Sequence, residues 1–220
     1  MVRKIARVGN KIVCFAHKIL HDDRDDAYLL ETPKGFHFTK KSKFYKSGPI
    51  LDQGTSSACV GFACAQFLKS FPKENDANPF EIYSLAQELD EFAGKEPRYY
   101  GTSIRGGMKA LFQMGFIKEY LWAKDVYSIR SFVVDRGPIV VGTHWYDRMS
   151  KLQNGFARIE GERKGGHAYL ISGVSVEQQA FRCINSWGSK WGENGRFWVS
   201  FSDMRILLDE GGVACSPIEV

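Results

Sequence analysis

The sequence is short of long apolar runs, of cysteine and of repetition. No stretch approaches the roughly 18 apolar residues that span a bilayer, so we expect no membrane anchor. The five cysteines are few and odd in number, which argues against a disulfide framework and favours the cytoplasm or another reducing compartment. The N-terminus lacks the uncharged apolar stretch of a secretory signal. A secreted form stays open, because a signal could precede the numbered chain.

The composition is that of a globular protein with an uneven charge. The 220 residues, 44% of them hydrophobic, are enough for one domain divided into two lobes. Residues 1–47 hold 11 Lys and Arg against 5 Asp and Glu, whereas the rest of the chain is close to neutral. This basic segment could meet an acidic partner or a protein inhibitor. Nucleic acid is less favoured, because no aromatic or glycine-rich binding motif accompanies the charge. The oligomeric state is left open.

Helical patterns fill the middle of the chain. Residues 2–20 alternate around Gly9-Asn10 and predict a hairpin, and Pro33-Lys34-Gly35 predicts a turn. Asn78 before Pro79 is a strong helix start. The predicted helices run from Ser56 or Ser57, either of which could cap, to about residue 70, and over about 78–92, 102 or 103 to 115, and 128–136.

Strand patterns follow from residue 139 onward. The predicted strands are 139–143, 168–174, 180–184, 196–200 and 212–216. Helices followed by strands indicate an α+β fold. We therefore expect a basic, β-like extension over residues 1–47 and a catalytic domain over 48–220, with a helical lobe to about 136 and a β lobe from about 137.

Cys59 falls in the first turn of a predicted helix. The helix dipole and the unpaired N–H groups there favour a thiolate, so the position predicts a lowered thiol pKa. Cys64 lies more than one turn deeper and is typical of a small core residue. Taken alone, Cys59 would also be a structural cysteine more often than not. Gln53, six residues earlier, could donate an amide hydrogen bond to the oxyanion of a tetrahedral intermediate.

His167 and Asn185 lie 18 residues apart at the ends of two successive predicted strands. If the strands are adjacent and antiparallel, the two side chains meet. The amide oxygen of Asn185 would then fix the tautomer and orientation of the imidazole. Trp187 could cover that hydrogen bond and exclude water. A thiol, an imidazole and an orienting amide are what peptide-bond hydrolysis through an acyl-enzyme requires.

Over about residues 48–220, the sequence resembles the papain-like cysteine peptidases. The resemblance rests on three motifs: Gln53-Gly54-x-x-x-x-Cys59, Gly166-His167-Ala168, and Asn185-Ser186-Trp187-Gly188-x-x-Trp191-Gly192-Glu193-Asn194-Gly195. It implies a two-lobed papain-like fold, with Cys59, His167 and Asn185 as the catalytic triad and Gln53 in the oxyanion hole. It also implies that Trp187 shields the triad, and that the substrate chain binds at Gly101, Thr102 and Gly166. No metal or organic cofactor is implied.

The sequence also departs from the family pattern. Ser56-Ser57-Ala58 and Val60 stand where the family has Cys-Gly-Ser and Trp, which makes the chain more similar to bacterial or viral members. The helical inhibitory segment of the family is not visible in residues 1–47. The resemblance implies an endopeptidase that acts on polypeptides through a thioester. An amidase, transferase or exopeptidase acting on a specific partner protein, and a non-catalytic binding module, are the alternatives.

Overall fold

The computed structural model describes residues 4–19, 23–29, 42–70, 75–92, 94–123 and 125–219. The turn predicted at Pro33-Lys34-Gly35 lies outside these residues. Within them, no helix is long and apolar enough to cross a membrane.

A small hairpin begins the described chain. β1 (Ile5–Val8) pairs antiparallel with β2 (Lys11–Cys14), which confirms the hairpin prediction. Gly9 takes a positive φ of 58° in the turn, a conformation that glycine adopts without strain. A 3-10 helix, η1 (Asp23–Tyr28), and a two-residue strand, β3 (Lys43–Phe44), follow before the main body of the protein.

Three helices form one side of the molecule: α1 (Cys59–Leu68), α2 (Pro79–Leu89) and α3 (Ile104–Gln113). Every residue of α1 is buried, as its apolar faces predict. Asn78 caps α2 through Phe80 N–H, which confirms the predicted start, although the helix ends three residues before Phe92.

The predicted serine cap of α1 is wrong. Ala58 occupies the N-cap position and no side chain caps the helix. The two serines have other partners: the Ser56 hydroxyl donates to Gln53 O, and the Ser57 hydroxyl lies 3.5 Å from the Cys14 sulfur. The first N–H groups of α1 are therefore left without a side-chain acceptor.

A seven-stranded sheet forms the other side. Its order is β4 (Ile117–Ala123), β9 (Val213–Glu219), β5 (Ile139–Tyr146), β6 (Arg163–Ser175), β7 (Ala180–Ile184) and β8 (Arg196–Ser200), and β3 pairs with β6. All these pairs are antiparallel. β7 and β8 have the predicted bounds. The sequence patterns missed β4 and α5 (Phe201–Asp209), and placed the ends of β5 and β6 too far inward.

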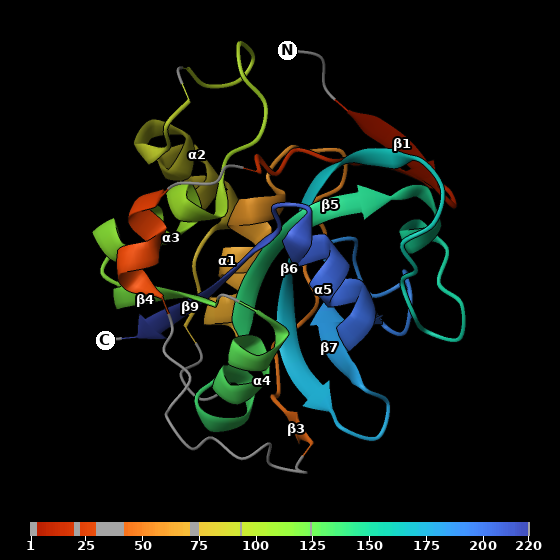
Figure 1. Cartoon of the computed structure of the whole chain (residues 1–220). Helices are drawn as coiled ribbons and strands as arrows, with labels where there is room; N and C mark the ends of the chain where they lie inside the picture. The colour runs from red at the N-terminus through yellow and green to blue at the C-terminus, as the bar shows by residue number, and fades with distance from the viewer. Residues whose placement is uncertain are drawn as a thin grey trace.

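Alternate residues of the central strands face two different cores. Ala168 and Leu170 of β6 pack with α1–α3, whereas Tyr169 and Ile171 face a second core with α4 (Val126–Asp135) and α5. Figure 1 shows α4 and α5 on the side of the sheet away from α1. The protein thus has the predicted α+β, two-lobed fold. β4 and α4 make more contacts with the strands of the sheet than with α1–α3.

Candidate active site

Cys59 is the first residue of α1, and the loop before it is held against the chain that follows β7. Gln53 N–H donates to Ser186 O at 2.8 Å, and Gly188 N–H donates to Leu51 O at 3.0 Å. These backbone bonds hold residues 51–53 against residues 186–188, which lie far away in the sequence. The thiol therefore starts a helix whose position relative to the sheet is fixed.

His167 and Asn185 meet as the sequence predicts. β6 and β7 pair antiparallel through Leu170 and Ile184. His167 Nε2 lies 2.8 Å from Asn185 Oδ1, which also accepts Ser186 N–H at 2.8 Å. An amide oxygen only accepts, so Nε2 of the neutral ring carries the proton and Nδ1 carries the lone pair. Within the described chain, Nδ1 has no hydrogen-bond partner.

The sulfur of Cys59 lies beside the strand that carries His167. The backbone N–H groups of Ala168, the residue after His167, and of Val60 in its own helix lie near it and act to lower its pKa. A third N–H, that of Ala16, comes from the N-terminal segment. The sulfur therefore lies at the junction of α1 and β6, beside the strand that carries His167.

Aromatic rings enclose the imidazole. The ring of Trp187 lies 5.0 Å from that of His167, tilted by 34°, and the ring of Trp145 meets it edge-on at 4.9 Å. Both tryptophans are almost fully buried. They exclude water from the bond between His167 and Asn185, which strengthens it. Trp187 thus lies where the sequence places a shield, and Trp145 is an enclosing residue that the sequence analysis did not identify.

Gln53 is buried beside the same residues, with its amide bonded at both ends. Ser186 Oγ donates to Gln53 Oε1 at 2.5 Å, and Gln53 Nε2 donates to Ser56 O at 2.9 Å. The second hydrogen of Nε2 is left for another acceptor. The backbone N–H of Cys59, at the uncapped start of α1, is the second predicted oxyanion donor.

Residues 15–19, which we call the strap, cross the site between the two lobes. His17 N–H donates to Gly166 O at 3.0 Å, and Lys18 N–H donates to Thr102 O at 2.9 Å. Gly101 lies so close that an added Cβ would be 1.6 Å from Ala16 O. In Figure 1 the N-terminal chain crosses the edge where α1–α3 meet β5 and β6. The predicted substrate groove is therefore filled by the chain's own N-terminal segment.

The three predicted substrate-binding residues differ in which backbone groups are already hydrogen-bonded, and to what. The carbonyl oxygens of Thr102 and Gly166 bind the strap. The backbone of Gly101 is already engaged, because its N–H donates to Tyr83 Oη at 2.8 Å and its oxygen accepts Gln87 Nε2 at 3.0 Å. At Gly101, the absence of a side chain lets another chain approach closely.

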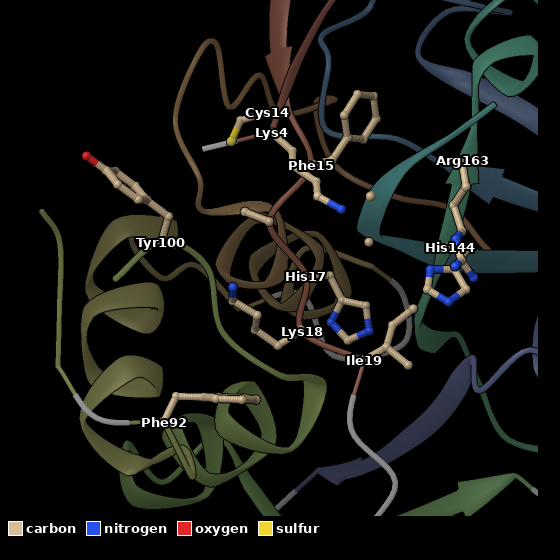
Figure 2. Close-up of a pocket in the computed structure, with 13 residues that line it drawn as sticks. Lys4, Cys14, Phe15, His17, Lys18, Ile19, Phe92, Tyr100, His144 and Arg163 are labelled. Atoms are coloured by element: carbon tan, nitrogen blue, oxygen red, sulfur yellow. The ribbon is translucent and has the colours of Figure 1, made fainter. Parts of the chain in front are cut away.

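The strap leaves an open cavity of about 330 Å³ along one side. Figure 2 shows His17 and Ile19 directed toward His144 and Arg163, with Phe92 and Tyr100 on the opposite side. The hairpin before the strap is bonded to the two loops that carry Gln53 and Trp187. Lys11 donates to Trp187 O at 2.8 Å and pairs with Asp52. Nothing in the local sequence pattern signals this docking, because each contact joins residues far apart in the chain.

The predicted lowering of the Cys59 pKa is wrong for this conformation. Burial raises the pKa of the thiol to about 11, although the N–H groups of Ala168 and Ala16 act in the opposite direction. Burial likewise lowers the pKa of His167 to about 4, against the hydrogen bond to Asn185. Both residues are fully covered. Withdrawal from water disfavours a thiolate–imidazolium pair more than the helix start favours it.

Comparisons with known proteins agree with the site. The model of the papain family cysteine proteases matches residues 106–210. The chain is 29% identical over 101 residues to a gut-specific cysteine proteinase of Caenorhabditis elegans, covering 44% of this chain and 31% of that protein. It is 24% identical over 211 residues to an uncharacterized peptidase C1-like protein of Acanthamoeba polyphaga mimivirus, covering 73% and 66%. The chain thus spans about a third to two thirds of these relatives.

Solved structures share the fold. Xylellain, a cysteine protease from Xylella fastidiosa, superposes with a TM-score of 0.73 at 18% identity, covering 94% of this chain and 96% of that one. Digestive procathepsin L2 of Tenebrio molitor gives a TM-score of 0.61 at 17% identity, covering 93% and 78%. The solved structures show that the chain has the papain-like fold, and residues 106–210 are similar to the papain family of cysteine proteases. A bacterial and a viral protein are among the similar ones, as the departures from the family pattern predict.

Proposed function

We propose that the protein is a cysteine endopeptidase with Cys59 as nucleophile and His167 as its proton acceptor. One observation carries the proposal. Asn185 holds the proton of His167 on Nε2, so that the basic Nδ1 is left without a partner next to the strand residue whose N–H lies near the sulfur. This orientation is what a general base for a thiol requires.

The reaction follows from these positions. Nδ1 of His167 takes the thiol proton, and the sulfur attacks the carbonyl carbon of the substrate. The oxyanion accepts hydrogen bonds from Gln53 Nε2 and Cys59 N–H. The imidazolium then protonates the leaving amine, so that the C–N bond breaks and a thioester remains. Water, deprotonated by His167, attacks the thioester, releases the acid and returns the proton to sulfur. Asn185 and Trp187 keep the ring oriented and shielded throughout.

An endopeptidase is favoured over an exopeptidase because the groove accepts a chain that continues on both sides of the sulfur. Phe15 lies toward Trp187, with ring centroids 6.0 Å apart, whereas Lys18 binds Thr102 across the other lobe. An exopeptidase would close one end of this groove. The strap thus supports a substrate class of extended polypeptides cut away from their ends.

We further propose that the strap holds the enzyme latent. The strap reaches the surroundings of the sulfur through the backbone N–H of Ala16. Its backbone uses the acceptors that a substrate would need. The basic N-terminal segment would then be an inhibitor within the same chain. All five cysteines are free, which supports a reducing compartment as the place of action.

The test is mass spectrometry of proteins cleaved by a chain whose strap is displaced by His17→Asp, which places a charge in a buried position, with and without Cys59→Ala. Cys64→Ala is the matched control, because Cys64 is buried in the same helix without access to the site. Internal cuts made by the His17→Asp chain and by the same chain with Cys64→Ala, and absent when Cys59→Ala is added, support an endopeptidase. Cuts confined to chain ends, or transfer products on one partner protein, would favour the alternatives. Cleavage that persists in Cys59→Ala would refute the mechanism.

A further inference from the structure

Basic side chains surround the cavity beside the strap. Of the described residues that line it, Lys4, Lys18 and Arg163 are cationic, and none is an aspartate or a glutamate. His17 and His144 add two imidazole rings to the same lining. A concave site with positive groups and no carboxylate on its walls has a positive potential, which attracts anions.

The basic groups at one end of this cavity come from parts of the chain that are far apart in the sequence. Lys4 directly precedes β1, whereas His144 lies on β5 and Arg163 is the first residue of β6. In Figure 2 the side chains of His144 and Arg163 lie beside each other, and the amino group of Lys4 is directed toward them. The lysine stem passes close to Gly165, where an added Cβ would be 3.3 Å from Lys4 Cδ. Glycine at this position therefore leaves room for Lys4 against the sheet.

These three groups are close enough to act on one another. Burial lowers the pKa of His144, and the charges of Arg163 and Lys4 lower it further. Glu210 acts in the opposite direction, but both of its carboxylate oxygens already accept from the hydroxyl of Tyr146. Glu210 is also not among the described residues that line the cavity. Docking of the N-terminal segment thus brings positive groups together, and an anion between them would remove the repulsion.

We propose that the cavity binds an oxyanion between Lys4, His144 and Arg163, namely the carboxylate or phosphate group of a small molecule or of an acidic polypeptide. A guanidinium binds such groups through two parallel hydrogen bonds, and an ammonium adds a point charge. Lys4 is tied to the strap, because its carbonyl oxygen accepts Phe15 N–H at 2.9 Å. One anion would therefore connect the N-terminal segment to β5 and β6 and fasten the docked strap. The binding site stands apart from peptidase activity, whereas the effect on latency rests on the proposed function.

Hydrogen exchange of the His17 and Lys18 amides tests the site in the full wild-type chain at neutral pH. The probe is inorganic phosphate, compared with sodium chloride at equal ionic strength. If phosphate binds only the docked form, protection of these amides should rise about tenfold at a phosphate concentration ten times the Kd. The amides inside α1 should not respond. No rise, or an equal rise throughout the chain, which is a general salt effect, would overturn the proposal.

Two variants assign the effect to the cavity. Arg163→Gln removes the guanidinium and should abolish most of the rise in protection. Arg205→Gln loses the same charge at an exposed position of α5 outside the cavity, and it should keep the full rise. The pKa of His144, followed by NMR, should increase with phosphate in Arg205→Gln and not in Arg163→Gln, because an adjacent anion favours the charged ring. Equal responses of the two variants would exclude the site.

Further probes identify the source of the anion. Succinate that protects the strap as phosphate does supports a small free anion, whereas protection by a short glutamate peptide at much lower concentration supports an acidic polypeptide. Epoxide labelling of Cys59 then separates the site from the proposed function, because labelling should slow by the factor by which strap protection rises. Protection without slower labelling would keep the site and reject latency. Absence of protection would reject the site, whatever the labelling rate.

Discussion

Acid should release the strap through His17. The imidazole is buried on the segment that fills the groove, and its contact with the backbone of Thr102 favours the charged ring less than burial disfavours it. It packs directly on β5, where an added Cβ at Gly142 would lie 2.2 Å from Nε2. The titratable groups around it are His167 of β6, His144 of β5 and the adjacent Lys18, and each of them disfavours a second positive charge.

The sign and size of the effect follow from linkage. Burial lowers the pKa of His17 from 6.5 to about 3 while the strap is docked. Docking is therefore at full strength above the pKa of the released ring and weakens as the pH falls below it. Each pH unit below the pKa of the released ring lowers the docking equilibrium constant about tenfold. At two units below that pKa the constant should therefore fall roughly 100-fold, or about 2.7 kcal/mol. The loss continues until the docked pKa is reached.

The assay is hydrogen exchange of the strap amides, expressed as protection relative to the intrinsic rate so that the pH dependence of the chemistry cancels. Protection at His17 and Lys18 should fall with acid, whereas the amides inside α1 should keep theirs. His167 contributes in the same direction, because the strap covers it as well. The variant His17→Asn removes the contribution of His17 and keeps that of His167. An equally steep fall in that variant, or no fall in the wild type, would refute the assignment to His17.

Three further predictions concern the strap and the thiol. Gly142→Ala should expel the ring of His17 and raise strap exchange at neutral pH, whereas Gly137→Ala, which meets nothing within 4 Å, should not. Cys59 should react slowly with a thiol-directed epoxide until the strap is displaced, and then much faster than the other cysteines; equal labelling of all five, read by peptide mapping, would contradict an activated nucleophile. In an unstrapped chain, Gln53→Ala should lower kcat roughly 10²–10³-fold with little change in KM, and unchanged turnover in steady-state kinetics would remove Gln53 from the mechanism.

The elements that the sequence predicts well are those with local signals. Asn78 before a proline marks the start of α2, a short and mostly apolar run marks β7, and alternation of buried and half-buried residues marks β8. β4 was missed because its buried residues do not alternate, since its two ends are covered and its middle is exposed. α5 was missed because it follows β8 without a break, capped by the last strand residue, Ser200.

The same difference between local and long-range signals applies to the site. The motif around Cys59, His167 and Asn185 could be read because spacing and residue type together specify the chemistry. The direction of the thiol pKa could not, because it depends on burial by a segment more than 40 residues away. At the helix start, the N–H of Val60 does act to lower the thiol pKa, but a local pattern contains no information on what covers the thiol.

Strap docking and ionisation of the catalytic pair are therefore coupled. With the strap docked, burial favours the neutral thiol and imidazole, because it raises the pKa of Cys59 and lowers the pKa of His167. Linkage is reciprocal, so whatever stabilises the ionised pair must weaken docking by the same factor. A substrate that needs the thiolate thus competes with the strap twice, once for the acceptors on Thr102 and Gly166 and once through the charge state of the pair.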